Sequence, residues 1–169
     1  IDGDRYRAVV TGDGSSVTSL YERTGVSVNG IDCGLRHDEG WTYDPENRVL
    51  TLDGGAETYT VTGSNELGLV RIRAAAKTDG GLVRLFADDL VLATVFEGES
   101  PVDVAPGTEL VIAADGEVRF TGADGGAGIH VPTGAVLNAS RTLFGDQLTA
   151  DALEVSGGAL AAGIGGNTG

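Results

Sequence analysis

The sequence predicts an all-β protein whose larger, C-terminal part winds as a parallel β-helix. Three observations support this prediction: the apolar segments are short and rich in β-branched residues, Gly, Pro, Asn and Asp separate them, and aliphatic pairs recur at a nearly constant spacing. The 169 residues include 28 glycines and only 4 prolines without a Gly-X-Y period, and 41% of them are hydrophobic, which is enough for a buried core. Strands too short to form a sheet alone pair with a neighbouring repeat, as in solenoids.

Residues 1–55 are expected to form a small N-terminal β cap. Residues 1–11 alternate in polarity, which is typical of a strand with one polar face. Residues 26–28 form a second candidate strand, and the Asn-Gly pair that follows is a common hairpin turn. Residues 40–54, GWTYDPENRVLTLDG, place a tight turn between an aromatic strand and an aliphatic strand, so they predict a β-hairpin.

Residues 56–169 are expected to form the coils. Leu90, Leu110 and Ile129 each begin a triplet in which two aliphatic residues flank a central one, and the starts of the triplets are almost evenly spaced. Such a spacing stacks equivalent residues on one wall of a coil, with the flanking aliphatic residues inside and the central residue, His130 in the third triplet, facing solvent. Further strand-like segments occupy residues 57–62, 68–73, 82–86, 90–95, 109–113 and 117–121.

A second wall is predicted from Val118, Val136 and Val155, which recur at almost the same spacing. Residues 74–77 are compatible with a helical turn, but an Asp-Gly-Gly sequence shortly after them stops a helix before it gains length. No helix is therefore expected.

Charge and cysteine content exclude several classes of protein. The net charge of −14, from 25 acidic and 11 basic residues, repels nucleic acid and anionic membranes, and no apolar run is long enough to insert into a membrane. Cys33 is the only cysteine, so no intrachain disulfide forms, and a buried position is expected for it. A catalytic pair with His37, which follows closely in the sequence, is the weaker alternative. The first residue is Ile1, which is expected of a processed protein or an excised fragment.

Catalytic motifs are scarce in the sequence, and a non-enzymatic protein without a cofactor is expected. The two histidines, His37 and His130, accompany no G-x-S-x-G motif and no zinc-ligand spacing. Asp88 and Asp89 are adjacent, so a strand directs them to opposite faces and they do not form the carboxylate pair of a glycosidase. One enzymatic alternative is a β-helical polysaccharide lyase, which would use aspartates to bind calcium and a basic residue to abstract a proton.

The basic residues for such a lyase would be Lys77 or the group Arg71, Arg73 and Arg84. These three arginines form a basic strip if the strands that carry them are neighbours, and the alternative is that acidic neighbours neutralise them across strands.

Two sequence features suggest a role for sugars. Trp41 and Tyr43 have the ring types of a sugar-stacking platform, and the alternative is that they cap a small core. Asn138 begins an Asn-Ala-Ser glycosylation sequon, a pattern that is frequent by chance.

Residues 40–54, 126–138 (GAGIHVPTGAVLN) and 161–166 (AAGIGG) resemble a recurrent pattern of secreted and surface proteins of gut and oral bacteria. These proteins are described as adhesin-like or carbohydrate-binding-domain-containing. The resemblance implies a right-handed parallel β-helix that follows a Trp-Tyr hairpin, and it implies no catalytic residue. The family has several AGIGG repeats, whereas this chain has one, which implies either a truncated helix with an open last coil or further coils beyond this sequence.

We therefore expect a non-enzymatic extracellular protein, secreted or wall-associated. It would act as an adhesin-type stalk or display module, and its partner would be a surface glycan or protein of a host or bacterium. Three alternatives remain. A fibre subunit would add strands through the open coil after Gly157 or through residues 1–11. A carbohydrate-binding module would expose Trp41 or Tyr43. A polysaccharide lyase fragment would require calcium.

Overall fold

The computed structural model of the chain describes residues 5–12, 15–35, 39–78, 80–139 and 152–166. These residues form strands and connecting turns, and none of them is helical. The strands make up an antiparallel hairpin and two mixed sheets of six and eight strands. The prediction of an all-β class is confirmed.

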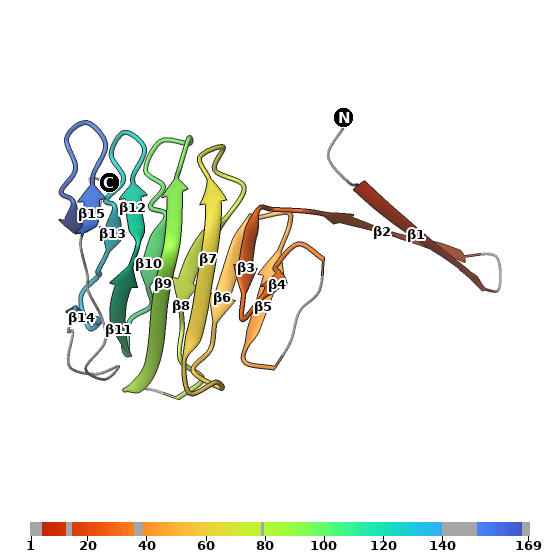
Figure 1. The fold of residues 1–169 in the computed structure, drawn as a ribbon, viewed down its shortest axis with the longest axis horizontal. Helices are drawn as coiled ribbons and strands as arrows, with labels where there is room; N and C mark the ends of the chain where they lie inside the picture. Colours follow the sequence, from red (N-terminus) through yellow and green to blue (C-terminus); the bar gives the residue numbers. More distant parts are fainter. Residues whose placement is uncertain (1–4, 13–14, 36–38, 79, 140–151, 167–169) are drawn as a thin grey trace.

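The N-terminal hairpin extends away from the two sheets (Figure 1). Its strands are β1 (Arg5–Gly12) and β2 (Ser15–Glu22), which pair antiparallel with Arg5 opposite Glu22. The strand predicted within residues 1–11 is therefore confirmed for its described part, and its partner is a strand that the sequence pattern did not indicate.

Two further antiparallel hairpins begin the sheets, as the turn chemistry predicts. Strands β3 (Val26–Val28) and β4 (Ile31–Asp32) are joined by Asn29 and Gly30, whose φ angles of 49° and 82° are those that a tight hairpin turn requires. Strands β5 (Trp41–Asp44) and β6 (Val49–Leu52) form the predicted aromatic hairpin.

From β6 onward the chain passes between the six-stranded and the eight-stranded sheet. From β8 onward each strand pairs in parallel with a strand of the preceding pass, whereas β6 and β7 pair antiparallel with β5 and β3. The six-stranded sheet receives β6, β8 (Arg71–Ala74), β10 (Val102–Val104), β13 (Ile129–His130) and β16 (Ile164–Gly165). The eight-stranded sheet receives β7 (Tyr59–Asn65), β9 (Gly81–Ala93), β11 (Thr108–Asp115), β12 (Glu117–Thr121), β14 (Val136–Ala139) and β15 (Ala152–Ser156).

Strand β9 unites two segments that the sequence pattern separates. Its first part pairs with β11 and its last part pairs with β12. Between them Asp89 adopts a φ of 45° and is skipped in the pairing with β7, where Thr62 pairs with Asp88 and Gly63 with Leu90, so it forms a β-bulge. The Asp88-Asp89 pair therefore lies inside one strand, but the bulge interrupts the alternation: Asp88 is partly exposed, Asp89 is exposed and Leu90 is buried, so neither carboxylate faces the core and the prediction of opposite faces is wrong.

The predicted register of the first wall is wrong. Leu110 pairs with Val83 before it and with Leu137 after it, and not with Leu90. Ile129 lies in the other sheet, where it pairs with Val102 and Ile164. Each pass of the chain contributes strands to both sheets, and loops of unequal length join them. The predicted spacing therefore links Leu110 with Ile129 on the other sheet, and with Leu90, which is on the neighbouring strand but several residues from the true partner Val83.

The inward direction predicted for this wall is nevertheless correct. Leu90, Leu110 and Ile129 are all fully buried, and His130 is on the outer side of its strand. The central residue of the second triplet, Val111, is only 2% exposed and so does not face solvent as predicted, although it lies outside the core cluster. Polarity within a strand therefore reports the face of the sheet even where the spacing between strands misleads.

The predicted register of the second wall is also wrong, although its three residues all lie in the eight-stranded sheet. Val118 pairs with Leu153, and Val155 pairs with Phe120. Val136 pairs with Glu109 and its side chain is 53% exposed, so it does not belong to an inner wall.

The two sheets share one hydrophobic core. It includes buried aliphatic residues from strands β3 to β13, and its largest side chains are Trp41, Tyr59 and Phe120. The loops at one edge lie side by side (Figure 1), and backbone hydrogen bonds join them, such as Gly98 N–H to Asp124 O at 2.7 Å and Gly125 N–H to Ala159 O at 3.0 Å. These loops stack so closely that a Cβ at Gly126 would overlap the carbonyl of Glu99.

Candidate functional site

A pocket of about 210 Å³ opens on the outer face of the six-stranded sheet. Polar side chains from three neighbouring strands line it: Arg71 and Arg73 from β8, Asp103 from β10 and His130 from β13. Val49, Ile72, Gly98 and Ser100 complete the lining. The pocket therefore combines side chains that are far apart in the sequence.

Parallel register places these side chains together. Arg73 pairs with Asp103, and Asp103 pairs with His130, so the three form one row across the sheet. Their neighbours in the adjacent row, Ile72 and Ile129, are fully buried. Because side chains alternate along a strand, the row of Arg73, Asp103 and His130 faces outward.

Asp103 joins the other two members of the row. Its Oδ1 lies 2.6 Å from Nδ1 of His130, which is a short hydrogen bond. Its Oδ2 lies 3.8 Å from Nε of Arg73, a distance too long for a hydrogen bond. The histidine therefore holds the carboxylate more tightly than the arginine does.

Glu99 organises the second charged group beside the pocket. Its Oε1 accepts a hydrogen bond from Nη2 of Arg48 at 2.7 Å and lies 3.6 Å from Nη1 of Arg71. Arg48 also donates from Nη1 to the carbonyl of Gly68 at 2.8 Å, and its guanidinium lies 4.3 Å from the centre of the Phe96 ring. Three different contacts thus fix Arg48, and through it Glu99.

Arg71 is less completely bonded. Its Nη2 donates to the carbonyl of Asn47 at 3.2 Å, but its Nε is buried and has no hydrogen-bond partner. The Oε2 atom of Glu99 is likewise buried without a partner. Buried polar atoms without partners are uncommon in folded proteins, because each loses its bonds to water. Arg71 is therefore bonded less completely than Arg48, although its unpartnered Nε is closed to solvent.

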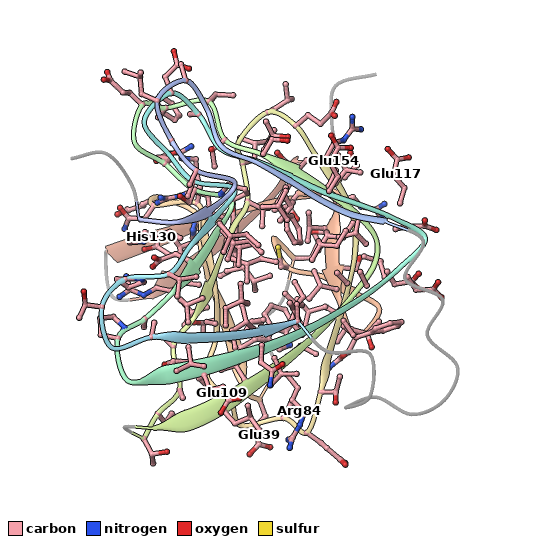
Figure 2. All side chains as sticks on the ribbon, turned by 90° about the vertical axis from the view of Figure 1, so that its left-hand side faces the viewer. Glu39, Arg84, Glu109, Glu117, His130 and Glu154 are labelled. Atoms are coloured by element: carbon pink, nitrogen blue, oxygen red, sulfur yellow. The ribbon has the colours of Figure 1, made fainter. Side chains whose placement is uncertain are left out.

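The arginine strip predicted from the sequence is wrong in one member. Arg71 and Arg73 lie on β8, but Arg84 lies on β9 in the other sheet. Figure 2 shows Arg84 on a different side of the molecule from His130. The alternative interpretation, neutralisation by acidic neighbours, describes Arg71 and Arg73, which have Glu99 and Asp103 as partners.

Trp41 and Tyr43, the predicted glycan contacts, pack with the core. The Trp41 side chain is only 2% exposed. Tyr43 is partly buried against the same cluster, and its hydroxyl donates to the carbonyl of Leu69 at 2.6 Å. These positions are the ones that a core cap occupies, and the buried indole presents no face for a sugar ring.

Cys33 is buried, as predicted. Burial raises the pKa of its thiol to about 12, and Thr24 Oγ1, 3.1 Å from the sulfur, only partly opposes this rise. A thiol with such a pKa is protonated at neutral pH and is a poor nucleophile. His37, the proposed catalytic partner, lies outside the described residues.

Within the described ranges, no group of three or more His, Cys, Asp or Glu side chains has an arrangement that fits a metal ion. The calcium site considered for the sequence therefore stays a prediction.

No helix long and apolar enough to cross a membrane occurs in the described part of the chain. Asn138 of the sequon lies on β14, and the serine at position 140 falls outside the described residues.

Sequence patterns missed the pocket because they missed β10. The segment Val102-Asp103-Val104 has an apolar-polar-apolar alternation that indicates a strand, but so short a segment does not stand out. Without β10, nothing brings His130 next to Arg73.

No family model matches the chain, and neither a curated protein nor a solved structure matches it.

Proposed function

We propose that the chain is a right-handed parallel β-helix that serves as a non-enzymatic stalk or display module of an extracellular bacterial protein, secreted or associated with the cell wall. One observation carries the proposal: from β6 to β16, successive passes of the chain pair in parallel, and the passes up to β15 pack on a single core. The sequence resemblance to adhesin-like surface proteins points to the same role.

Stacked coils suit presentation because each coil contacts only its neighbours and the array grows in one direction. Backbone hydrogen bonds run from coil to coil in both sheets and in the loops, so bending requires many of them to change together. An excess of acidic residues, with a net charge of −14, favours solubility of such a body. Its partner would be a glycan or protein on a host or bacterial surface.

A second candidate function, a fibre subunit that adds strands at its last coil, has its own supporting observation. Ile164 of β16 is 50% exposed, whereas Ile129, its neighbour in the ladder, is fully buried. Leu160 in the preceding loop is 91% exposed. Apolar residues at an open sheet edge favour pairing with another strand, including one from a second copy.

An adhesion assay tests the first proposal. Beads that carry the purified chain should adhere to immobilised mucin, matrix protein or bacterial cells more than beads that carry the heat-unfolded chain. The same preparation, incubated with acidic polysaccharides and calcium, should release no unsaturated sugar. Lyase activity, or equal adhesion of folded and unfolded chain, would contradict the proposal.

Light scattering at increasing protein concentration tests the fibre alternative. Assembly should occur with the native chain and decrease in Ile164→Asp, whereas Leu67→Asp, at a position that is already 74% exposed and away from β16, should assemble normally. A native chain that stays monomeric at high concentration would rule out this alternative.

A further inference from the structure

We propose that the pocket on the six-stranded sheet binds a carboxylate-bearing ligand, such as an acidic sugar, through Arg71 and Arg73. This inference goes beyond the display function, because a rigid stalk does not require a ligand site on its wall. Its basis is the unequal distribution of hydrogen bonds among the charged side chains of the pocket.

The two acidic groups near the pocket already have short bonds to other partners. Arg48 holds Glu99 at 2.7 Å, and His130 holds Asp103 at 2.6 Å. The distances from Arg71 to Glu99 and from Arg73 to Asp103 are 3.6 and 3.8 Å, which exceed those of charge-assisted hydrogen bonds. Neither acid therefore forms a short hydrogen bond to Arg71 or Arg73.

Both arginines have N–H donors without a close acceptor. The Arg73 side chain is 51% exposed, and among the described residues its guanidinium makes only the long contact to Asp103. Arg71 is more enclosed, at 26%, and its buried Nε has no partner. Each guanidinium can present two parallel N–H groups, which matches the two oxygens of a carboxylate.

Geometry allows both arginines to act on one ligand. Arg71 and Arg73 are two positions apart on β8, so they project from the same face of the sheet about 7 Å from each other. One guanidinium can bind a carboxylate while the other binds a neighbouring oxygen of the same molecule. A pocket of about 210 Å³ between them has room for a small ligand.

The local charge also differs from that of the whole protein. Two arginines and one aspartate line the pocket, and Arg48 and Glu99 next to it balance each other. The net charge of the chain is −14, so most of its surface repels a carboxylate. Binding should therefore be confined to this pocket and should weaken as salt is added.

Amide chemical shifts of the isotope-labelled chain test the proposal. Glucuronate should give saturable shifts at Arg73, Asp103 and His130, and glucose, which has the same ring without the carboxylate, should give none. Acetate distinguishes the source of the carboxylate: weaker binding than glucuronate supports an acidic sugar, and equal binding supports any small carboxylate. Phosphate that binds as tightly as glucuronate would overturn the carboxylate assignment.

Two matched variants test whether glucuronate binds at this pocket. Arg73→Gln should weaken glucuronate binding roughly tenfold, the value of one charge-assisted hydrogen bond. Arg84→Gln removes the same charge from the other sheet and should leave the affinity unchanged. The amide spectrum of each variant reports whether it is folded. Absence of saturable shifts in the native chain, or native affinity in Arg73→Gln, would overturn the proposal.

Discussion

Replacing Leu110 by alanine tests how successive passes of the chain stack. Leu110 is fully buried and lies in the ladder between Val83 and Leu137, so strands on both sides pack around its side chain. The substitution removes three carbon atoms and leaves a cavity that rigid neighbouring strands fill poorly.

The expected decrease in the free energy of unfolding follows from the burial of the Leu110 side chain. Loss of about three buried methylene equivalents, at roughly 0.8 kcal/mol each, gives about 2.4 kcal/mol. The cavity adds to this, so we expect a decrease in the free energy of unfolding of about 3 to 4 kcal/mol. For a chain of 169 residues this corresponds to a fall in Tm of roughly 6–16 °C.

Urea unfolding measures this decrease. Trp41 is the only tryptophan and is buried, so its fluorescence reports unfolding of the core, and circular dichroism follows the strands independently. Val136→Ala is the matched control: the sequence pattern placed Val136 on an inner wall, but it is 53% exposed, and its loss should cost less than about 0.5 kcal/mol. Equal costs for Leu110→Ala and Val136→Ala would refute the stacking described above.

Three further predictions concern Cys33, Asp53 and the stacked loops. Burial raises the pKa of the Cys33 thiol to about 12. At about pH 8.5, Cys33 should therefore resist thiol reagents in the native chain and react with them when the chain unfolds. Fast labelling of the folded chain would contradict this prediction. Burial of Asp53 raises its pKa, but hydrogen bonds from Lys77, the Gly55 amide and Tyr59 outweigh this and hold it below its usual value. The stability that Asp53 provides should therefore be present at neutral pH and be lost as pH falls below about 4, so thermal melts of the native chain and Asp53→Asn should differ at pH 7 and converge in acid. Gly126→Ala should lower the free energy of unfolding by about 1 to 3 kcal/mol, because the new Cβ meets the carbonyl of Glu99, whereas Gly166→Ala, with no atom within 4 Å, should have little effect in the same urea titration.

The sequence predicts local structure here better than long-range register. Turn residues and alternation identified the hairpins β3–β4 and β5–β6, because a short turn fixes which residues face each other. Inward-facing residues such as Leu110 were also identified, since alternation within a strand depends on local polarity alone.

Register between successive passes depends on loop lengths, which local polarity does not encode. Phe120 pairs with Leu92 on one side and with Val155 on the other, and these two partners are at unequal distances from it along the chain. A search for one constant spacing therefore matches residues of different sheets, as it did for Leu110 and Ile129. The pocket was missed for the same reason: the row of Arg73, Asp103 and His130 exists only in the correct register.

A disulfide cross-link tests the register between passes most directly. Leu82 and Glu109 face each other in the parallel pairing of β9 and β11, where Cα atoms lie about 4.8 Å apart, within the span of a disulfide. With the register predicted from the sequence spacing, Glu109 would instead lie beside Asp89, but Asp89 is next to the other end of β11, about 20 Å away. Under mild oxidation, followed by mass spectrometry of proteolytic fragments, Leu82→Cys with Glu109→Cys should cross-link within the monomer, and Asp89→Cys with Glu109→Cys should not. Cross-linking of the second pair but not the first would contradict the register described for β9 and β11, and cross-linking of neither pair would contradict their parallel pairing.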